Sequence, residues 1–171
     1  MELLWEELTL GLDSPGRAAQ VLLRIIVAVV LGGIVGMQRE QAGKPAGVRT
    51  HMLVSLATAV VVLACAGMGM QYDAQSRVIQ GIVTGIGFIG AGSILKLNEE
   101  RDIQGLTTAA GLWLTAAIGI ACGVGTIGIA LITAVVTVIV LALAGVIETR
   151  EANRASKKEK EKDKDKDKDK E

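Results

Sequence analysis

The chain has 171 residues, of which 50% are hydrophobic and 2% aromatic, and its 18 basic and 18 acidic residues give a formal net charge of zero. Much of this charge lies in residues 157–171, which are all Lys, Asp or Glu. The rest of the chain is therefore richer in small aliphatic residues than a soluble domain requires. This composition argues against a water-soluble protein and against a large catalytic domain outside a membrane. Two cysteines are too few for a framework of several disulfides.

Five apolar segments have about the length that a membrane-spanning helix needs, which is about 20 residues. Ser14 and Pro15 form an N-cap followed by proline in the first helical position, which predicts where the first helix begins. We therefore predict an all-α fold, a polytopic membrane bundle of five transmembrane helices. An alternative has four spans, with one glycine-rich segment re-entrant. The predicted spans are 18–37, 50–70, 78–97, 106–122 and 126–147.

The flanking charges predict the topology of this membrane domain, residues 18–147. Basic residues gather in the connections after the first and third spans and after the fifth, which places the N-terminus outside and the C-terminus in the cytoplasm. Leu4, Leu8 and Leu12 share a helical stripe beside Trp5, so residues 1–17 are predicted to form an interfacial segment. The charged tail, residues 148–171, is predicted to be disordered.

Glycines inside the predicted spans indicate close helix packing, because small residues let helix backbones approach each other in lipid. The third span is small on several faces, so we expect it to be the central helix of the bundle. A broken helix that lines a substrate path is the alternative. The predicted helix-packing residues are Gly32, Gly36, Gly81, Gly85, Phe88, Gly90 and Gly92.

Polar residues are densest at the predicted cytoplasmic side, where two helices begin. Positive dipole ends beside basic side chains favour an anion, an acidic peptide or a lipid phosphate. The alternative is an ordinary positive-inside signal with an Arg–Glu pair that fixes the loop. We expect Glu40 to pair with Arg49 across this loop, and Arg24 to snorkel outward or to donate to Gln80. The candidates on this side are Arg39, Glu40, Lys44, Gly47, Arg49, His51, Thr107 and Thr108.

No combination of residues in the sequence predicts catalysis. His51 is the sole histidine, and no carboxylate lies inside an apolar core. There is no Ser/His/Asp set, no metal-ligand spacing and no phosphate-binding loop. We therefore expect a protein that is not an enzyme, with no cofactor, no metal site and no nucleic-acid partner.

Four motifs in order resemble the MgtC/SapB family of bacterial inner-membrane proteins. They are GMQRE (36–40), KPAGVRTH (44–51), RVIQGIVTGIGFIGAGSI (77–94) and GLTTAAGLWLTAAIG (105–119). The resemblance implies a five-helix membrane domain with the C-terminus inside, and it adds Gln80 and Trp113 to the candidate functional residues. The chain is similar to the short, SapB-like form, which lacks the soluble C-terminal domain of longer members.

The family resemblance also directs the functional hypothesis. It implies a role in adaptation to low magnesium or acid stress, and for MgtC-like members it implies inhibition of the F-type ATP synthase and modulation of other membrane proteins. We expect a non-enzymatic inner-membrane protein that acts on membrane partners within the lipid bilayer. The alternative is a transporter or channel for Mg²⁺ or another small solute. Homo-oligomer formation is left open.

Overall fold

The computed structural model describes residues 1, 4, 9, 11, 12, 14–96 and 103–168, with residues 95, 96, 103 and 148–168 described by their backbone alone. Most of the predicted interfacial segment, residues 1–17, lies outside the described residues. The chain divides into two compact units, Met1–Val138 and Ile139–Glu171. The first unit contains the helices and side chains on which the functional argument rests.

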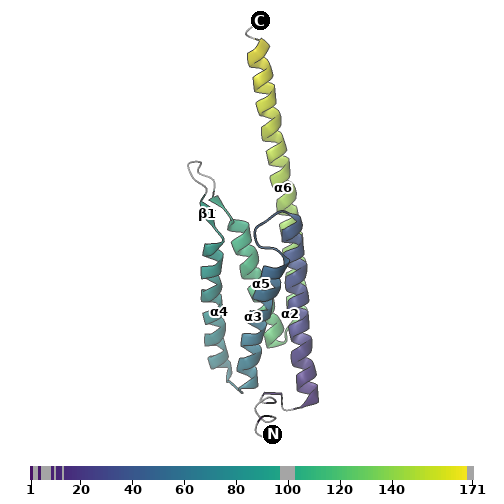
Figure 1. Ribbon diagram of the computed structural model, residues 1–171, viewed down its shortest axis with the longest axis vertical. Helices are drawn as coiled ribbons and strands as arrows, with labels where there is room; N and C mark the ends of the chain where they lie inside the picture. Colours follow the sequence, from purple (N-terminus) through teal and green to yellow (C-terminus); the bar gives the residue numbers. More distant parts are fainter. Residues whose placement is uncertain (2–3, 5–8, 10, 13, 97–102, 169–171) are drawn as a thin grey trace. The chain divides into compact units, whose positions relative to one another are not determined.

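Five long helices are present in the described chain, as predicted (Figure 1). Between α4 and α5, two short strands form an antiparallel hairpin in which Leu95 pairs with Gln104. The elements are α2 Pro15–Gln41, α3 Val48–Gly67, α4 Tyr72–Gly92, β1 Leu95–Lys96, β2 Ile103–Gln104, α5 Leu106–Val124 and α6 Ile127–Lys168.

The first helix begins where the sequence predicts. The Ser14 hydroxyl accepts a hydrogen bond from the backbone N–H of Arg17 at 3.2 Å, and Pro15 occupies the first turn of α2. Such a cap satisfies one N–H that would otherwise have no partner within the helix.

The third predicted span, residues 78–97, differs most from the structure. Its helix, α4, begins at Tyr72 and ends at Gly92, and the following residues turn into β1. Gly105, with a φ of 96°, then allows β2 to lead directly into α5, and a side chain there would meet the Ser93 carbonyl. The hairpin therefore takes residues that the apolar pattern had assigned to the membrane.

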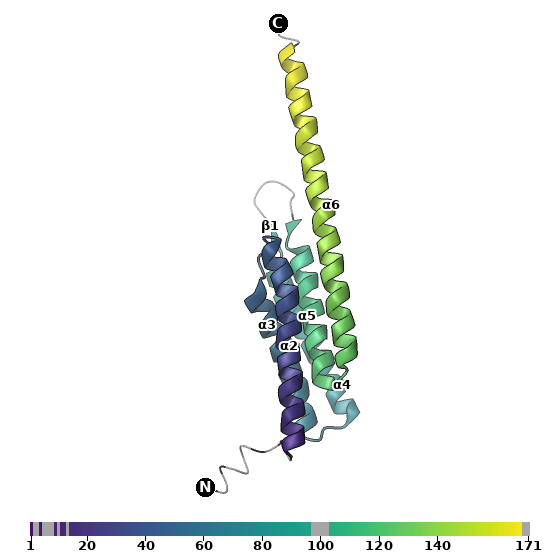
Figure 2. The ribbon, with the colours of Figure 1, turned by 90° about the vertical axis from the view of Figure 1, so that its right-hand side faces the viewer.

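The bundle of the first unit is built around α3 and α5 (Figures 1 and 2). Both helices contact each other and both contact α2 and α4. By contrast, α4 buries just Ile86 and Gly90 among its 21 residues. The prediction that this third segment is the central helix is therefore wrong, since most of its small residues are exposed. Gly90 is the exception among the glycines of α4, because it lies against Ala109 of α5 as a packing residue.

Within the described part of the chain, four helices are long and apolar enough to cross a membrane: α2, α3, α5 and residues Ile127–Ile147 of α6. The fifth helix, α4, is not among them, because glycines and polar residues such as Asp73, Arg77 and Gln80 lower its mean hydropathy. Five helices are thus confirmed, whereas five membrane spans and the orientation of the termini remain predictions.

The charged tail also differs from its prediction. Disorder was expected from residue 148, but α6 continues as a helix to Lys168. From Lys158 onward, residues three apart carry opposite charges, which favours a helix, whereas residues four apart carry like charges, which opposes it.

Candidate functional site

A buried arginine closes one end of the bundle, which we call the hairpin end because it also carries β1 and β2 (Figure 1). Arg39 lies on the stripe of α2 that begins with Ala28 and continues through Leu31 and Val35, so its side chain points into the bundle. Its exposed fraction is 2%. Arg39 Nη2 donates to Thr108 Oγ1 at 3.2 Å and to Thr107 Oγ1 at 3.3 Å. The end of α2 is thereby tied to the first turn of α5.

The neighbouring acid has a different partner from the one predicted. Glu40 Oε2 accepts a hydrogen bond from the backbone N–H of Val48 at 3.0 Å. The N-cap of α3 is Gly47, which has no side chain to offer, so Glu40 supplies the missing acceptor and a negative charge at the helix N-terminus. Arg49 is exposed and forms no ion pair with Glu40. The predicted Glu40–Arg49 pair is therefore wrong, because the helix N-terminus is nearer to the carboxylate.

His51 lies one turn into α3 and is completely buried. Its Nδ1 is 2.9 Å from the carbonyl oxygen of Gly47, which can only accept, so this contact assigns the N–H to Nδ1. Its Nε2 has no hydrogen-bond partner among the described residues, and neither has the Ser55 hydroxyl one turn further along α3. A side chain added at Gly111 of α5 would come to 3.7 Å from this Nε2. Polar atoms thus line the seam between α3 and α5.

Glycines of α2 and α5 let both helices approach the backbone of α3. A Cβ at Gly32 would lie 2.7 Å from the carbonyl oxygen of His51, and one at Gly36 would lie 2.6 Å from Val48 Cα. On α5, a Cβ at Gly119 would overlap the Thr58 hydroxyl and the Ser55 carbonyl. α2 and α5 therefore both press their glycines against α3, which is how helices associate in the absence of a strong hydrophobic drive.

Two arginines of α2 occupy the other end of the bundle, where α3 and α5 finish. Arg17 Nη2 donates to the Ala66 carbonyl at 3.0 Å, and Arg24 Nη1 donates to the Gly123 carbonyl at 3.0 Å. Both acceptors are carbonyls in the last turn of a helix, where the dipole favours a cation. The predicted contact of Arg24 with Gln80 is not observed, because Arg24 donates to α5 and Gln80 is exposed. Outward snorkelling of Arg24 remains a prediction.

The structure thus brings part of the predicted set together. Arg39, Glu40, Gly47, His51, Thr107 and Thr108 meet at the hairpin end, and the backbone N–H of Lys44 joins the Arg39 carbonyl at 3.0 Å. Arg49, Gln80 and Trp113 have exposed side chains instead. Ser55 and Thr58 of α3 are buried polar residues that were not among the predicted ones. Their four- and seven-residue spacing from His51 was the available signal.

Arg39 and Glu40 are the charged side chains whose contacts build this cluster. Within the described part of the chain, no three His, Cys, Asp or Glu side chains come together as metal ligands. The cluster carries a buried guanidinium, and the hydroxyls of Thr58 and Thr115 donate to carbonyls of their own helices.

Long apolar helices packed through glycines define this chain as a multi-pass membrane protein. It belongs to the MgtC family, whose model matches residues 25–150. The chain is 40% identical over 133 residues to the Escherichia coli K12 protein named "Putative magnesium transporter YhiD". The matched region covers 72% of this chain and 60% of the relative.

Two further relatives place the chain in the same family. It is 37% identical over 119 residues to Protein SrpB of Synechococcus elongatus, covering 62% of this chain and 65% of that protein. It is 40% identical over 104 residues to Protein MgtC of Salmonella typhimurium, covering 61% of this chain and 43% of the relative. The chain therefore spans less than two thirds of the length of these relatives. No solved structure matches it.

Proposed function

We propose that this protein is a non-enzymatic protein of the bacterial inner membrane that acts by lateral contact with other membrane proteins, in adaptation to low Mg²⁺ or acid stress. The observation that carries the proposal is the outward face of α4. A Cβ added at Gly81, Gly85 or Gly92 would meet no described atom of the chain within 4 Å. Phe88, on the same face, is 84% exposed.

This face is poorly suited to lipid and well suited to a second helix. Gly81 and Gly85 form a small-xxx-small pair, the spacing that lets two membrane helices approach closely. Gln80 is exposed beside them, and an amide in hydrocarbon is stabilised when a neighbouring helix offers it a hydrogen bond. A partner helix would satisfy both features at once.

The sequence and the family suggest a partner and an orientation to test. The family resemblance suggests the membrane part of the F-type ATP synthase as one partner to test. The basic connections suggest that the hairpin end faces the cytoplasm, with the start of α2 outside.

Transport of Mg²⁺ is the second candidate, and it rests on the name of the Escherichia coli relative, a putative magnesium transporter. The buried cation of Arg39 weighs against it. A guanidinium that is 2% exposed at one end of the bundle repels a divalent cation that would have to pass nearby.

Site-specific photo-cross-linking in cells tests the proposal. Phe88 is replaced by a photoreactive phenylalanine analogue, and Leu22, which is 59% exposed on α2, serves as the matched control. We expect a discrete protein adduct from position 88 during growth in low Mg²⁺, and none from position 22. Lipid adducts alone at position 88, together with normal growth of a Gly85→Leu variant, would refute a functional α4 face.

A further inference from the structure

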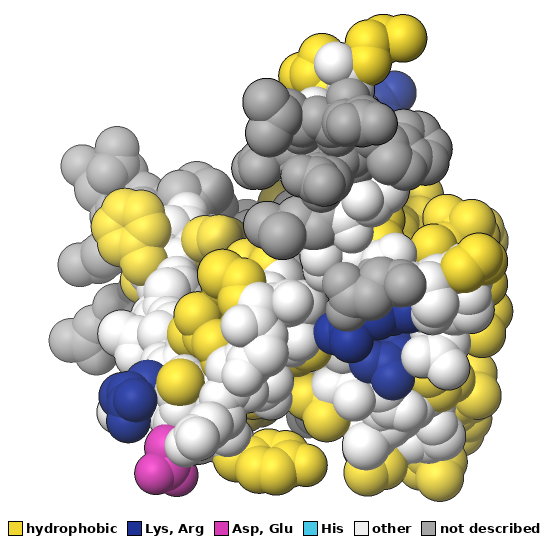
Figure 3. Space-filling view, turned by 90° about the horizontal axis from the view of Figure 1, so that it is seen from below, with side chains coloured by type: hydrophobic (Ala, Val, Ile, Leu, Met, Phe, Trp, Pro, Cys, Tyr) yellow, Lys and Arg dark blue, Asp and Glu magenta, His cyan; other side chains and the backbone are white. Residues whose placement is uncertain are grey.

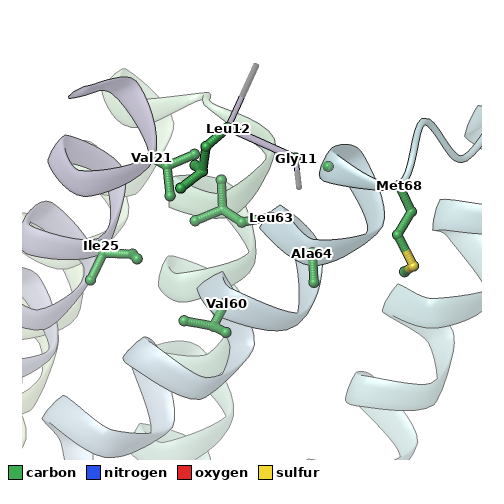
Figure 4. Close-up of a pocket in the computed structure, with 9 residues that line it drawn as sticks. Gly11, Leu12, Val21, Ile25, Val60, Leu63, Ala64 and Met68 are labelled. Carbon is green, nitrogen blue, oxygen red and sulfur yellow. The ribbon is translucent and has the colours of Figure 1, made fainter. Parts of the chain in front are cut away.

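Two adjoining cavities open at the end of the bundle opposite the hairpin. The larger has a volume of about 640 Å³ and is apolar (Figure 4). The side chains that line it come mainly from α2 and α3 and include Val21, Ile25, Val60, Leu63, Ala64 and Met68. Its size lies within the range of pockets that hold small organic ligands, about 300–1,000 Å³.

The smaller cavity, of about 370 Å³, is polar and shares Val21 and Leu63 with the larger one. Its other side chains include Arg17, Gln20 and Arg24. None of its described lining residues is acidic. Figure 3 shows Lys and Arg side chains, in dark blue, gathered among hydrophobic ones at this end of the molecule. An arginine-lined cavity therefore continues into an apolar one.

The arginines are fixed in place before any ligand arrives. Each holds a helix-end carbonyl at 3.0 Å through one terminal nitrogen, Arg17 that of Ala66 and Arg24 that of Gly123. A guanidinium has five N–H donors, and Arg24 uses none of its others on a described residue. A planar guanidinium held in this way can bind phosphate oxygens through two parallel hydrogen bonds.

We propose that the two cavities form one binding site for a phospholipid with an anionic headgroup. Its phosphate lies in the arginine-lined cavity, and part of an acyl chain fills the apolar cavity between α2 and α3. The chemistry favours a lipid over a free anion because the charged cavity opens into an apolar one that a soluble phosphate cannot fill. Basic pockets between membrane helices recognise lipid headgroups in this way. The role of α4 in partner contact is independent of this site.

Two variants test the site without removing an arginine that stabilises the fold. Ala64→Leu fills the apolar cavity from an exposed position, and Ala57→Leu, on an exposed part of α3 outside both cavities, is its control. Gln20→Glu places a negative charge in the polar cavity, and Gln71→Glu, at the N-cap of α4, is its control.

The measurement is thermal unfolding of the purified full chain in detergent, titrated with phosphatidylglycerol, with phosphatidylcholine of the same acyl chains, or with inorganic phosphate. We expect phosphatidylglycerol to raise the melting temperature and the other two to have little effect. Both site variants should weaken the apparent affinity for phosphatidylglycerol about tenfold or more, and both controls should retain it. An equal response to phosphatidylcholine, a response to inorganic phosphate that matches phosphatidylglycerol, or unchanged affinity in both site variants would each overturn the proposal.

Discussion

The guanidinium of Arg39 lies 3.2 Å from the hydroxyl oxygen of Thr108, so that the last turn of α2 and the first turn of α5 share a buried hydrogen bond. Both side chains are almost fully buried, at 2% and 1% exposure. A buried charge has lost its hydration, so the removal of one of its hydrogen-bond partners is costly.

The first prediction concerns this contact. Thr108→Val removes the acceptor and keeps the shape, so the free energy of unfolding should fall by about 1–3 kcal/mol. Thr107→Val should cost less, because Thr107 is exposed and its hydroxyl has access to other partners. Thermal or denaturant unfolding in detergent measures both, with Thr84→Val on the exposed surface of α4 as a control. A larger loss for Thr107→Val than for Thr108→Val would contradict the assignment.

Glu40 provides the second prediction, because it caps α3 and does not pair with Arg49. Glu40→Gln keeps an oxygen that can accept from the Val48 N–H and should be tolerated better than Glu40→Ala. Loss of the cap in Glu40→Ala should cost about 0.5–2 kcal/mol. Arg49→Gln should be nearly silent, and its effect should add to that of Glu40→Ala. Strong coupling in this double-mutant cycle would contradict this assignment and support an ion pair between Glu40 and Arg49.

Glycines on α5 and α4 give the third prediction, since the same substitution should have opposite consequences. Gly119→Ala drives a methyl group into Ser55 and Thr58 and should destabilise the fold by about 1–3 kcal/mol. Gly85→Ala meets open space and should be neutral or stabilising, because alanine favours a helix more than glycine does. The yield of folded protein and its melting temperature distinguish the two. Equal damage at both positions would mean that α4 is packed within the monomer.

Much of the fold follows from the sequence because long apolar runs and the Ser14–Pro15 cap determine helices almost alone. The position of α4 in the bundle does not follow from the sequence. Its glycines signal that a backbone can approach, but they do not say whether the approaching helix belongs to the same chain. The hairpin was missed because Leu95 is as apolar as a helix residue, and the pairing of Leu95 with Gln104 is a contact across the loop.

For the candidate site, the sequence predicts which residues lie close together but not which atoms they contact. The sequence places Arg39, Glu40 and His51 near one another, because they flank a short connection. It cannot tell whether Glu40 meets a side chain or a helix N–H, since this depends on the angle at which α3 leaves the loop. The roles of Arg17 and Arg24 were hidden for a related reason, because their partners are carbonyls, which every residue has.

The fourth prediction is the orientation in the membrane. Lys44→Cys, at the hairpin end, should be protected from an impermeant maleimide in intact cells, because basic connections stay in the cytoplasm. Thr126→Cys, in the turn between α5 and α6, should be labelled. The native Cys65 and Cys122 are buried and should contribute little background. Labelling of Lys44→Cys, with protection of Thr126→Cys, would show that the chain has the opposite orientation.

The central claim is that this protein works through contact with membrane partners and not by moving Mg²⁺. Flux of Mg²⁺ into liposomes that contain the purified full chain tests it most directly, with an ionophore as positive control and empty liposomes as the baseline. We predict flux equal to that of empty liposomes, for the native chain and for Gly85→Leu alike. Saturable, protein-dependent flux in the native chain would contradict the account and favour the transporter.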